Sequence, residues 1–513
     1  MIKKTSLVRL AATLLLIIGL SSCSDDKVEP ADNSDTGYSI FIMSDIHVMS
    51  PELLIEKGEA YESYVKDDPK MLEESAEVLN AAIEIVLDKK PDLVLIPGDL
   101  TKDGELLSHQ LVVSMLERIR TVGIPVIVIP GNHDIDNPKS VYFMGDVTRE
   151  AESILPEQFA RLYRDYGYSR EETVRDPASL SFTCEPLPGL VLICLDTNRY
   201  EENLHVGRGD TVNHNQTAGR IRKATLEWMW EQADLAHSQG KQVIAMQHHN
   251  AVEHYDGQAT LQFPYVVENY RDVAEGMIEH GIHLVLTGHQ HLHDIAQYRY
   301  KTDNIIDSLV DISTGSVVSY PNAWRIISVN RSFTKWNVST GYIKSIPSVA
   351  DMQTECYNRL MSNLVYGLAW HIKEFWPTIE SYRNTLSILG LPPTILPDTP
   401  QQTTRLLMEY LGTSLSEGFM IHNAGNENRN PRSGVVIDEF EEGVHKLCTE
   451  LLKNDSTEEV SDRNVIMLQM LILSYVKPYL TSMLTDTNQM QSAALSSVTD
   501  DLNVELGIPL STF

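Results

Sequence analysis

The chain holds several short clusters of aspartate, asparagine and histidine, whose side chains can bind a metal ion or move a proton. Carboxylate, amide oxygen and imidazole together suit divalent cations, and none of the clusters contains a cysteine. The residue types therefore predict metal-assisted or acid–base chemistry. The clusters are Asp45 with His47, Asp99, the run Asn132-His133-Asp134, the pair His248-His249, and His289 with His291.

Each cluster follows a short apolar run that is typical of a buried strand in a parallel sheet. Asp45 and His47 are two residues apart, so in extended backbone they project to the same side. Reactive groups of open α/β sheets lie just past the carboxyl ends of the strands, so we expect the five clusters to meet in one site. An isolated histidine is weak evidence, but five such clusters in series are not. The runs cover residues 38–43, 92–97, 124–129, 242–246 and 282–286.

The ordered series D-x-H, G-D, G-N-H-D, H-H and G-H-x-H resembles that of the calcineurin-like metallophosphoesterases, from about Tyr38 to Arg325. The sequence segments around Gly98–Thr101 and Ile312–Ser316 resemble those of bacterial class III cyclic nucleotide phosphodiesterases. This resemblance implies an α/β (four-layer α+β) fold with two stacked mixed β-sheets flanked by helices. The alternation of apolar runs and helical periods along the chain is consistent with that fold.

The resemblance also implies a centre with two metal ions, each held by three residues of its own. A shared carboxylate, Asp99, bridges them because its two oxygens can each bind one ion. A hydroxide bridging the ions would then attack phosphorus in line with the leaving oxygen. Manganese, iron and zinc all remain open as the metal. One ion is assigned to Asp45, His47 and His291, and the other to Asn132, His248 and His289.

His133 stands next to a predicted ligand and is the candidate general acid for the leaving group. Asn132 and His133 are the expected substrate contacts. In some branches of the family an aspartate three residues beyond the bridging aspartate supports this histidine. Here that position is Lys102, with Asp103 next to it, so the supporting residue stays open. His249 and His293 are expected to support the site or the core instead of binding metal.

The predicted reaction is hydrolysis of a small-molecule phosphate ester, with cyclic nucleotides among the phosphodiesters considered. A phosphomonoesterase or nucleotidase is the alternative, because it would use the same ligands. A non-catalytic surface binding lipoprotein is an alternative of another class, since a fold does not fix a function. The net charge of −30 argues against a nucleic-acid polymer as partner, because its phosphates would be repelled.

The first residues of the chain predict an export signal, which is not part of the folded domain. A basic start precedes the apolar run 10–20, which is too short to span a bilayer. The run ends at Leu20-Ser21-Ser22-Cys23, which resembles a bacterial lipobox. Residues 1–23 are therefore expected to be a lipoprotein signal, with lipidation of Cys23 anchoring the protein to a membrane of a Gram-negative-type bacterium. The destination is the periplasmic face or the cell surface, and a plain secretory signal is the alternative.

The rest of the chain divides by its periodicity. Residues 24–37 are acidic and polar and predict a tether, and residues 38–346 hold all the clusters. Residues 347–513 change to long amphipathic segments, which predicts a C-terminal helical bundle domain. Its loop 421–428 could cover the catalytic face or be a solvated connection. Residues 134–177 predict a helical insertion near the mouth of the site, and a disulfide between Cys184 and Cys194 stays open.

Overall fold

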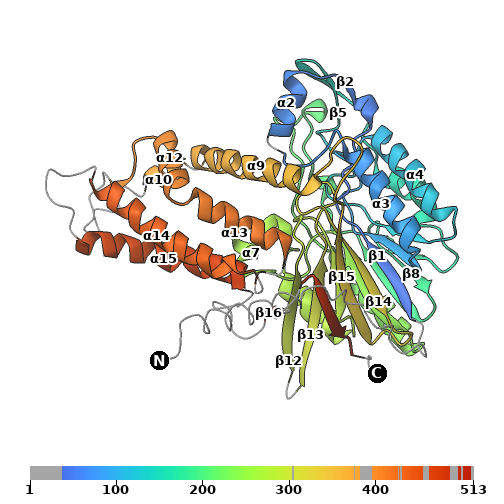
Figure 1. The fold of residues 1–513 in the computed structure, drawn as a ribbon. Coiled ribbons are helices and arrows are strands. Elements are labelled where there is room, and N and C mark those ends of the chain that lie inside the picture. Colours follow the sequence, from blue (N-terminus) through green and yellow to red (C-terminus); the bar gives the residue numbers. More distant parts are fainter. Residues whose placement is uncertain are drawn as a thin grey trace, which may run out of the picture. The chain divides into compact units, whose positions relative to one another are not determined.

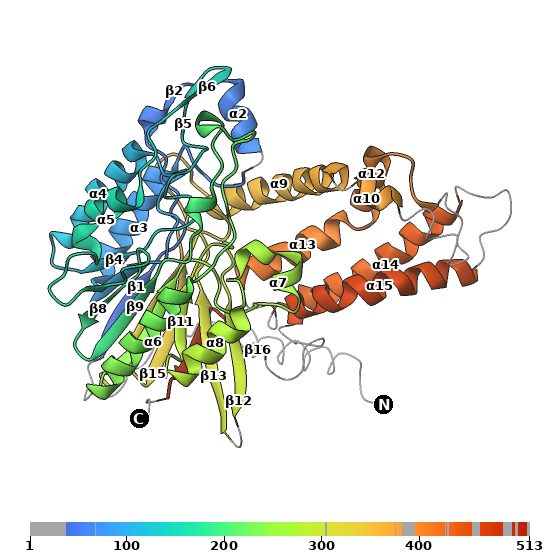
Figure 2. The same ribbon diagram turned by 180° about the vertical axis from the view of Figure 1, so that it is seen from behind.

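The computed structural model describes residues 37–66, 68–302, 305–374, 376–381, 395–425, 427, 430–453, 462–485, 495–497 and 501–509. Residues 38 to 513 belong to one compact unit. The predicted signal segment and Cys23 lie outside the described residues, as does the tether except for Gly37. This unit contains two large sheets with helices on their outer faces (Figures 1 and 2). Most of their strands lie between residues 38 and 342.

The first sheet carries the strands that precede the N-terminal clusters. Its order is β17-β15-β14-β1-β3-β4, in which β1, β3 and β4 are parallel neighbours. Their apolar side chains are buried, as the continuous β-branched runs predict. The strands are β1 (Tyr38–Ile42), β3 (Leu93–Ile96), β4 (Val126–Val128), β14 (Ala323–Val329), β15 (Lys335–Tyr342) and β17 (Asn503–Gly507).

The second sheet carries the strands that precede the C-terminal clusters. Its order is β16-β12-β13-β11-β10-β9-β8-β7, and β9, β10, β11 and β13 run parallel to one another. The strands are β7 (Val174–Arg175), β8 (Phe182–Leu187), β9 (Leu190–Leu195), β10 (Gln242–Gln247), β11 (Leu284–Thr287), β12 (Ile295–Thr302), β13 (Ile305–Ser313) and β16 (Leu495–Ser497).

The two sheets pack face to face, and helices cover the outer face of each. Helices α3 (Ser75–Lys89) and α4 (Leu106–Arg120) bury their apolar stripes in the same core as the first sheet. Helices α6 (Lys223–Ser238) and α8 (Tyr270–Glu279) form a second core with the other sheet (Figure 2). The predicted fold class, stacked mixed sheets flanked by helices, is therefore confirmed.

The insertion 134–177 differs from the expectation. It contains a hairpin, β5 (Val141–Met144) and β6 (Val147–Glu150), which forms a small sheet with β2 (Leu54–Glu56). Only the short helix α5 (Pro156–Leu162) is α-helical there. The aromatic side chains of this insertion are buried in apolar cores, so they pack the fold. They are Phe143, Phe159, Tyr163, Tyr166 and Tyr168.

The described residues between 351 and 485 form mainly helices. The preceding part of the chain also contains the helices α2 (Glu59–Lys66) and α7 (Gln258–Leu261). Among the described residues, no single helix is long and apolar enough to cross a bilayer, although the bent pair Asp462–Ser474 and Val476–Thr485 meets the test by length and composition. The helices are α9 (Met352–Glu374), α10 (Trp376–Ser381), α12 (Pro400–Tyr410), α13 (Gly412–Ala424), α14 (Arg432–Lys453) and α15 (Asp462–Thr485).

The chain returns to both sheets after the last helix, which the sequence did not reveal. Strand β16 pairs with β12 at the edge of the second sheet, and β17 pairs with β15 at the edge of the first. The possible disulfide is absent from the structure, since Cys184 and Cys194 are buried free thiols on neighbouring strands.

Candidate metal centre

The carboxyl ends of five strands bring all seven predicted ligands to one place. Asp45 and His47 follow β1, Asp99 follows β3 and Asn132 follows β4. On the second sheet, the ligands follow β10 and β11 in the same way. Because the two sheets face each other, their ligand-bearing ends meet at one edge, as the sequence predicted. The second sheet supplies His248, His289 and His291.

Most of the predicted ligands have an unusual backbone conformation with positive φ. Of ten described non-glycine residues with positive φ, five are predicted ligands. This left-handed region is unfavourable for residues with a Cβ and persists where the surrounding structure demands it. The chain therefore carries strain where side chains are turned toward a common point. The five are Asp45, His47, Asp99, His289 and His291.

Two motif glycines allow the ligand loops to approach one another. A Cβ on Gly131 would lie 2.1 Å from Asp99 Oδ1, and one on Gly288 would lie 2.5 Å from Asp45 Oδ2. Both distances are too short for atoms that are not bonded. The glycine in each motif is thus required by contact with a ligand on another strand.

The first group of ligand atoms surrounds a point between β1 and β11. The Nε2 atoms of His47 and His291 are 3.0 Å apart, and His291 Nε2 is 3.6 Å from Asp45 Oδ1. Burial lowers the pKa of His47 well below its ordinary value and that of His291 to about 3, so both rings are neutral. Two neutral imidazoles that point nitrogen to nitrogen beside a carboxylate fit a shared cation.

The second group lies between β3, β4 and β10. His248 Nε2 is 3.3 Å from Asp99 Oδ2 and 3.2 Å from Asn132 Oδ1. One carboxylate oxygen of Asp99 and one ring nitrogen from each of His248 and His289 lie within 4.8 Å of one another. His248 Nδ1 is held by the carbonyl of Pro97 at 2.8 Å, which leaves Nε2 for a ligand bond.

Asp99 belongs to both groups. Its Oδ2 is 3.6 Å from His47 Nε2 in the first group and 3.3 Å from His248 Nε2 in the second. Burial would raise its pKa, but the charges of the His248 and His133 rings hold the pKa well below the ordinary value. Asp45, by contrast, is raised in pKa to about 7, mainly by burial. A carboxylate that stays ionised between two sets of ligands is placed where a bridging ligand would be.

His133 lies beside these groups and is held through one ring nitrogen. Its Nδ1 is 2.7 Å from the carbonyl of Lys102 and 3.0 Å from Asp103 Oδ1. Burial lowers its pKa, but the charges of Asp99 and Asp103 outweigh burial, and the pKa is raised overall. Asp103 is therefore the support that the sequence left open, while Asp134 accepts hydrogen bonds from backbone amides and shapes the turn.

Lys102 keeps Asp103 ionised. The Lys102 ammonium is fully buried, 2.5 Å from Asp103 Oδ2 and 2.9 Å from Glu105 Oε1. Although burial alone would raise the pKa of Asp103, the Lys102 charge leads it to fall below the ordinary value. The chain Lys102–Asp103–His133 thus favours a protonated imidazole next to the ligand groups.

The other histidines of the motifs are used elsewhere. His249 Nδ1 is 2.7 Å from Thr197 Oγ1, and its Nε2 is 2.9 Å from the carbonyl of Thr217. His293 is buried and its Nε2 is 2.9 Å from Thr340 Oγ1. Both rings are occupied by protein groups, as the sequence suggested.

A pocket of about 350 Å³ opens above the ligands, and Lys70 lines it unexpectedly. The Lys70 Nζ is 2.9 Å from Asp68 Oδ2, and its side chain is 10% exposed. Burial lowers the pKa of Lys70, but the Asp68 charge outweighs it and the pKa is raised. The sequence gave no signal for this residue, because it stands in a loop without a recognised motif.

The helices after residue 347 also line this pocket. Leu360 and Leu364 come from α9, and Phe419 and Asn423 from α13. Asn423 belongs to the stretch 421–428 that the sequence predicted as a loop, but residues 421–424 are the last turn of α13. The carbonyl of Asn423 also accepts a hydrogen bond of 3.2 Å from the amide of His293. The helical region therefore covers one side of the space over the ligands.

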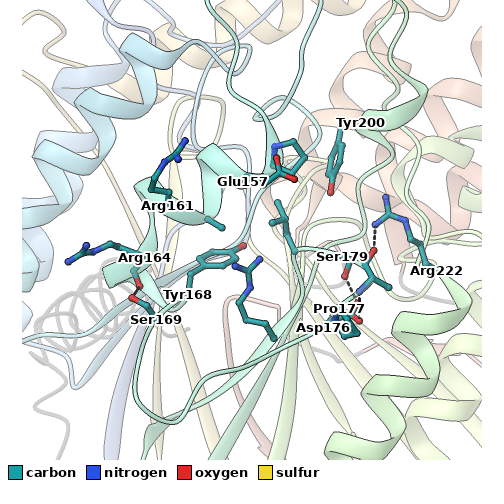
Figure 3. A pocket seen from close by; sticks show the side chains of 15 residues that line it. Glu157, Arg161, Arg164, Tyr168, Ser169, Asp176, Pro177, Ser179, Tyr200 and Arg222 are labelled. Atoms are coloured by element: carbon teal, nitrogen blue, oxygen red, sulfur yellow. Dashed lines mark hydrogen bonds between the residues drawn. The ribbon is translucent and has the colours of Figure 1, made fainter.

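A second pocket, of about 610 Å³, shares no lining residue with the first (Figure 3). Arg161, Arg164, Arg175 and Arg222 line it, and the guanidinium of Arg175 lies 5.3 Å from the ring centre of Tyr168. Arg222 is partly neutralised by Glu201 at 2.9 Å, and Arg164 by Asp165 at 3.4 Å. It contains none of the residues predicted from the motifs.

The chemistry of the seven donors fits metal ions. Seven buried or nearly buried oxygen and imidazole donors converge, and the buried Nδ1 of His47 has no hydrogen-bond partner among the described residues. Imidazole, carboxylate and amide donors gathered at one point are suited to divalent cations and poorly suited to an apolar core. The residues fit a pair of ions, and the metal's identity is not fixed by them.

Comparison with known proteins gives a family match. Residues 38–293 match the model of the calcineurin-like phosphoesterases. No curated protein is significantly similar in sequence. Among solved structures, a dimetal phosphatase from Danio rerio aligns over 60% of this chain and 96% of its own, with 13% identity and a TM-score of 0.39. The purple acid phosphatase PPD1 from yellow lupin (Lupinus luteus) seeds aligns over 60% of this chain and 52% of its own, with 12% identity and a TM-score of 0.36.

Proposed function

Residues 38–293 place the chain in the calcineurin-like phosphoesterase family of dimetal phosphoester hydrolases, and from this premise we propose that it hydrolyses phosphodiesters, cyclic nucleotides among them. The substrate is a small molecule, since a chain of net charge −30 repels a nucleic-acid polymer. The expected order of preference is diester over monoester.

The apolar cover of the pocket carries this proposal. Leu360, Leu364 and Phe419 stand in the same pocket as His133 and Asn132. A diester has two organic substituents, and the second needs a place beside the reacting phosphorus. A monoester has no second substituent and would leave this apolar surface exposed to water.

The chain's own residues divide the work. Asp45, His47 and His291 would hold one ion, Asn132, His248 and His289 the other, and Asp99 both. The ions, when bound, supply Lewis acidity and a water of lowered pKa. His133 then gives a proton to the leaving oxygen, because Asp103 holds its Nδ1 and leaves its other ring nitrogen available to the pocket. Lys70 offers its ammonium to a phosphoryl oxygen.

Turnover of bis(p-nitrophenyl) phosphate and of p-nitrophenyl phosphate, measured with added Mn²⁺, tests the order. A diester preference is expected. A monoester preference of tenfold or more would favour a phosphomonoesterase or nucleotidase. The Lys70 ammonium could bind the phosphoryl group of a monoester as well. Asp99→Ala is expected to abolish hydrolysis of both esters with loss of metal. Wild-type activity in that variant would contradict the two-metal centre.

We also propose export and lipid anchoring through Cys23. The basic start, the apolar run and the Leu20–Cys23 sequence support it. A labelled fatty acid supplied to expressing cells should be incorporated into the wild type and lost in Cys23→Ser, with the protein moving from the membrane to the soluble fraction. Equal labelling of both would contradict lipidation at this cysteine.

A further inference from the structure

An apolar cavity of about 590 Å³ lies among the helices that follow residue 347, and we call it the bundle cavity. Helices α9, α12, α13 and α15 supply its walls. None of the described residues that line it is charged, and only Ser416 and Tyr479 among them carry a polar group on the side chain. Its other lining residues are Leu364, Met408, Gly412, Leu415, Phe419, Val476, Leu480 and Met483.

The bundle cavity adjoins the pocket of about 350 Å³ over the metal ligands, here called the metal pocket. Leu364 of α9 and Phe419 of α13 line both spaces, so these two side chains stand at the boundary between them. On one side of this boundary are the polar groups of Asn132, His133 and Lys70. On the other side the lining is almost entirely apolar. A molecule that crosses the boundary would therefore need one polar end and one apolar end.

The walls of the bundle cavity keep apolar surface that the fold itself does not bury. Leu415, Phe419 and Met483 are only partly buried, and Val476 is 37% exposed. Contact between such surface and water is unfavourable, and apolar surface gathered in one concave place commonly marks a binding site. The volume and the lining of the cavity are also typical of a site for a small molecule.

The helices around the bundle cavity are fastened to the part of the chain that carries the metal ligands. On α15, Ser482 Oγ accepts a hydrogen bond of 2.8 Å from the amide of Asp256. The ring of Tyr479 packs against Gly257 so closely that a Cβ there would lie 2.4 Å from the ring. Helix α13 is held through Asn423, as described above. The path from the metal ligands into the cavity is therefore set by the fold.

We propose that the bundle cavity binds a long alkyl or acyl chain of a phosphodiester whose phosphate lies at the metal ligands. The inference rests on the proposed function and narrows its substrate class to amphiphilic phosphodiesters. The chain would pass Leu364 and Phe419, while Lys70 contacts the phosphate. A cyclic nucleotide has a polar nucleoside and no such chain, so it would leave the cavity unfilled.

The reaction itself is an ordinary hydrolysis. Water adds to phosphorus, the bond from phosphorus to one ester oxygen breaks, and that oxygen takes up a proton. The products are a phosphomonoester and an alcohol, and the long chain stays on one of them.

The test compares methyl, butyl and octyl p-nitrophenyl phosphate, each below its critical micelle concentration, with the full chain and added Mn²⁺. The three diesters share the reacting phosphorus and the leaving group and differ only in the chain. A fully buried methylene corresponds to about a fourfold change in affinity. We therefore expect kcat/KM for the octyl ester to exceed that for the methyl ester by about 50-fold or more. Equal values for the three diesters would overturn the proposal and leave diester hydrolysis as such intact.

A variant locates the chain in the bundle cavity. Leu415 lines this cavity and not the metal pocket, so the indole of Leu415→Trp would occupy the space of the chain. The ratio of kcat/KM for the octyl ester to that for the methyl ester should fall about tenfold or more, the equivalent of about two buried methylenes. Val435→Trp is the matched control, because it enlarges a 39% exposed side chain on α14 outside both spaces, and it should keep the wild-type ratio. An unchanged ratio in Leu415→Trp would overturn the proposal. If that variant does not fold, Met483→Trp replaces it.

A binding measurement separates this proposal from the proposed function. Methyl-, butyl- and octylphosphonate carry an anionic head and the same chains, and they are not hydrolysed. Their inhibition constants are measured against whichever p-nitrophenyl ester is turned over, or their affinities by calorimetry if neither is. A monoester preference would refute the proposed function, yet tighter binding of octylphosphonate that is lost in Leu415→Trp would still assign the cavity to an ester chain. Equal binding of the three phosphonates would overturn the role of the cavity whichever ester is preferred.

Discussion

Asp103→Asn should slow the hydrolysis of esters with poor leaving groups more than that of p-nitrophenyl esters. Asp103 Oδ1 lies 3.0 Å from His133 Nδ1, and this carboxylate favours the protonated ring. Asparagine keeps the size of the side chain and removes the charge. The carbonyl of Lys102, 2.7 Å from the same nitrogen, continues to hold the ring in place.

The size of the effect follows from that geometry. A hydrogen bond to a charged group contributes about 1.5–3 kcal/mol, and about 1.4 kcal/mol corresponds to a factor of ten. We therefore expect kcat for an alkoxide leaving group to fall by about 10- to 100-fold in Asp103→Asn. His133→Ala removes the acid altogether and should cost about 10²- to 10⁴-fold. For p-nitrophenolate, which leaves without a proton, both losses should be small.

The assay compares kcat for a ribose cyclic phosphate and for bis(p-nitrophenyl) phosphate, with the metal content of each variant measured. Folding should survive, because Lys102 keeps Glu105 at 2.9 Å. Asp234→Asn is the matched control, since it removes the carboxylate of another His–Asp pair, 2.8 Å from His280 Nδ1 between α6 and α8. Equal losses on both substrates, with both metals bound, would refute general acid catalysis by His133 and leave it an electrostatic role.

Four other outcomes are expected. Lys70→Met should raise KM about tenfold, as loss of a charged hydrogen bond predicts, and an unchanged KM in steady-state kinetics would contradict its contact with substrate. Phe419→Ala should lower kcat/KM for diesters more than for monoesters, and equal effects would remove the apolar cover from specificity. Gly131→Ala should lose metal in elemental analysis, because its new Cβ would lie 2.1 Å from Asp99 Oδ1; full metal content would count against this. Burial lowers the pKa of His109 to about 3 from 6.5, so the unfolded chain takes up a proton that the folded chain refuses, and the free energy of unfolding should fall as pH decreases through this window. Urea unfolding of the wild type and His109→Gln should show the slope reduced in the variant, and identical slopes would be contrary evidence.

Local sequence patterns were enough to predict where the ligands stand. Each ligand cluster follows a strand directly, so chain connectivity places Asp45 or His248 at a sheet edge whatever the rest of the fold does. The same reasoning could not find Lys70, which reaches the pocket from a loop. Asp103 was visible as a neighbour of the expected position, but its partner became clear only from the turn that carries His133.

Features that depend on contacts between distant parts of the chain were out of reach. The left-handed backbone at Asp45 and His289 arises from packing of loops against one another, and it could not be predicted from the residue types at these positions. Strands β16 and β17 are short and lie within a stretch that has helical periodicity before it. The side chains of α9 and α13 over the pocket could not be assigned either. An amphipathic period shows which face of a helix is buried, but it does not show which part of the protein packs against that face.

The return of the chain to both sheets bears on how the protein is made. The edges of β12 and β15 receive their partners from residues 495–497 and 503–507, close to the end of the sequence. During synthesis these two edges stay unpaired while more than one hundred residues of chain are produced between them and their partners. An unpaired strand edge can recruit another chain. A molecule cut short after α15 would keep every residue of its metal centre but would have two unpaired strand edges. We therefore expect such a molecule to aggregate even though its catalytic residues are all present.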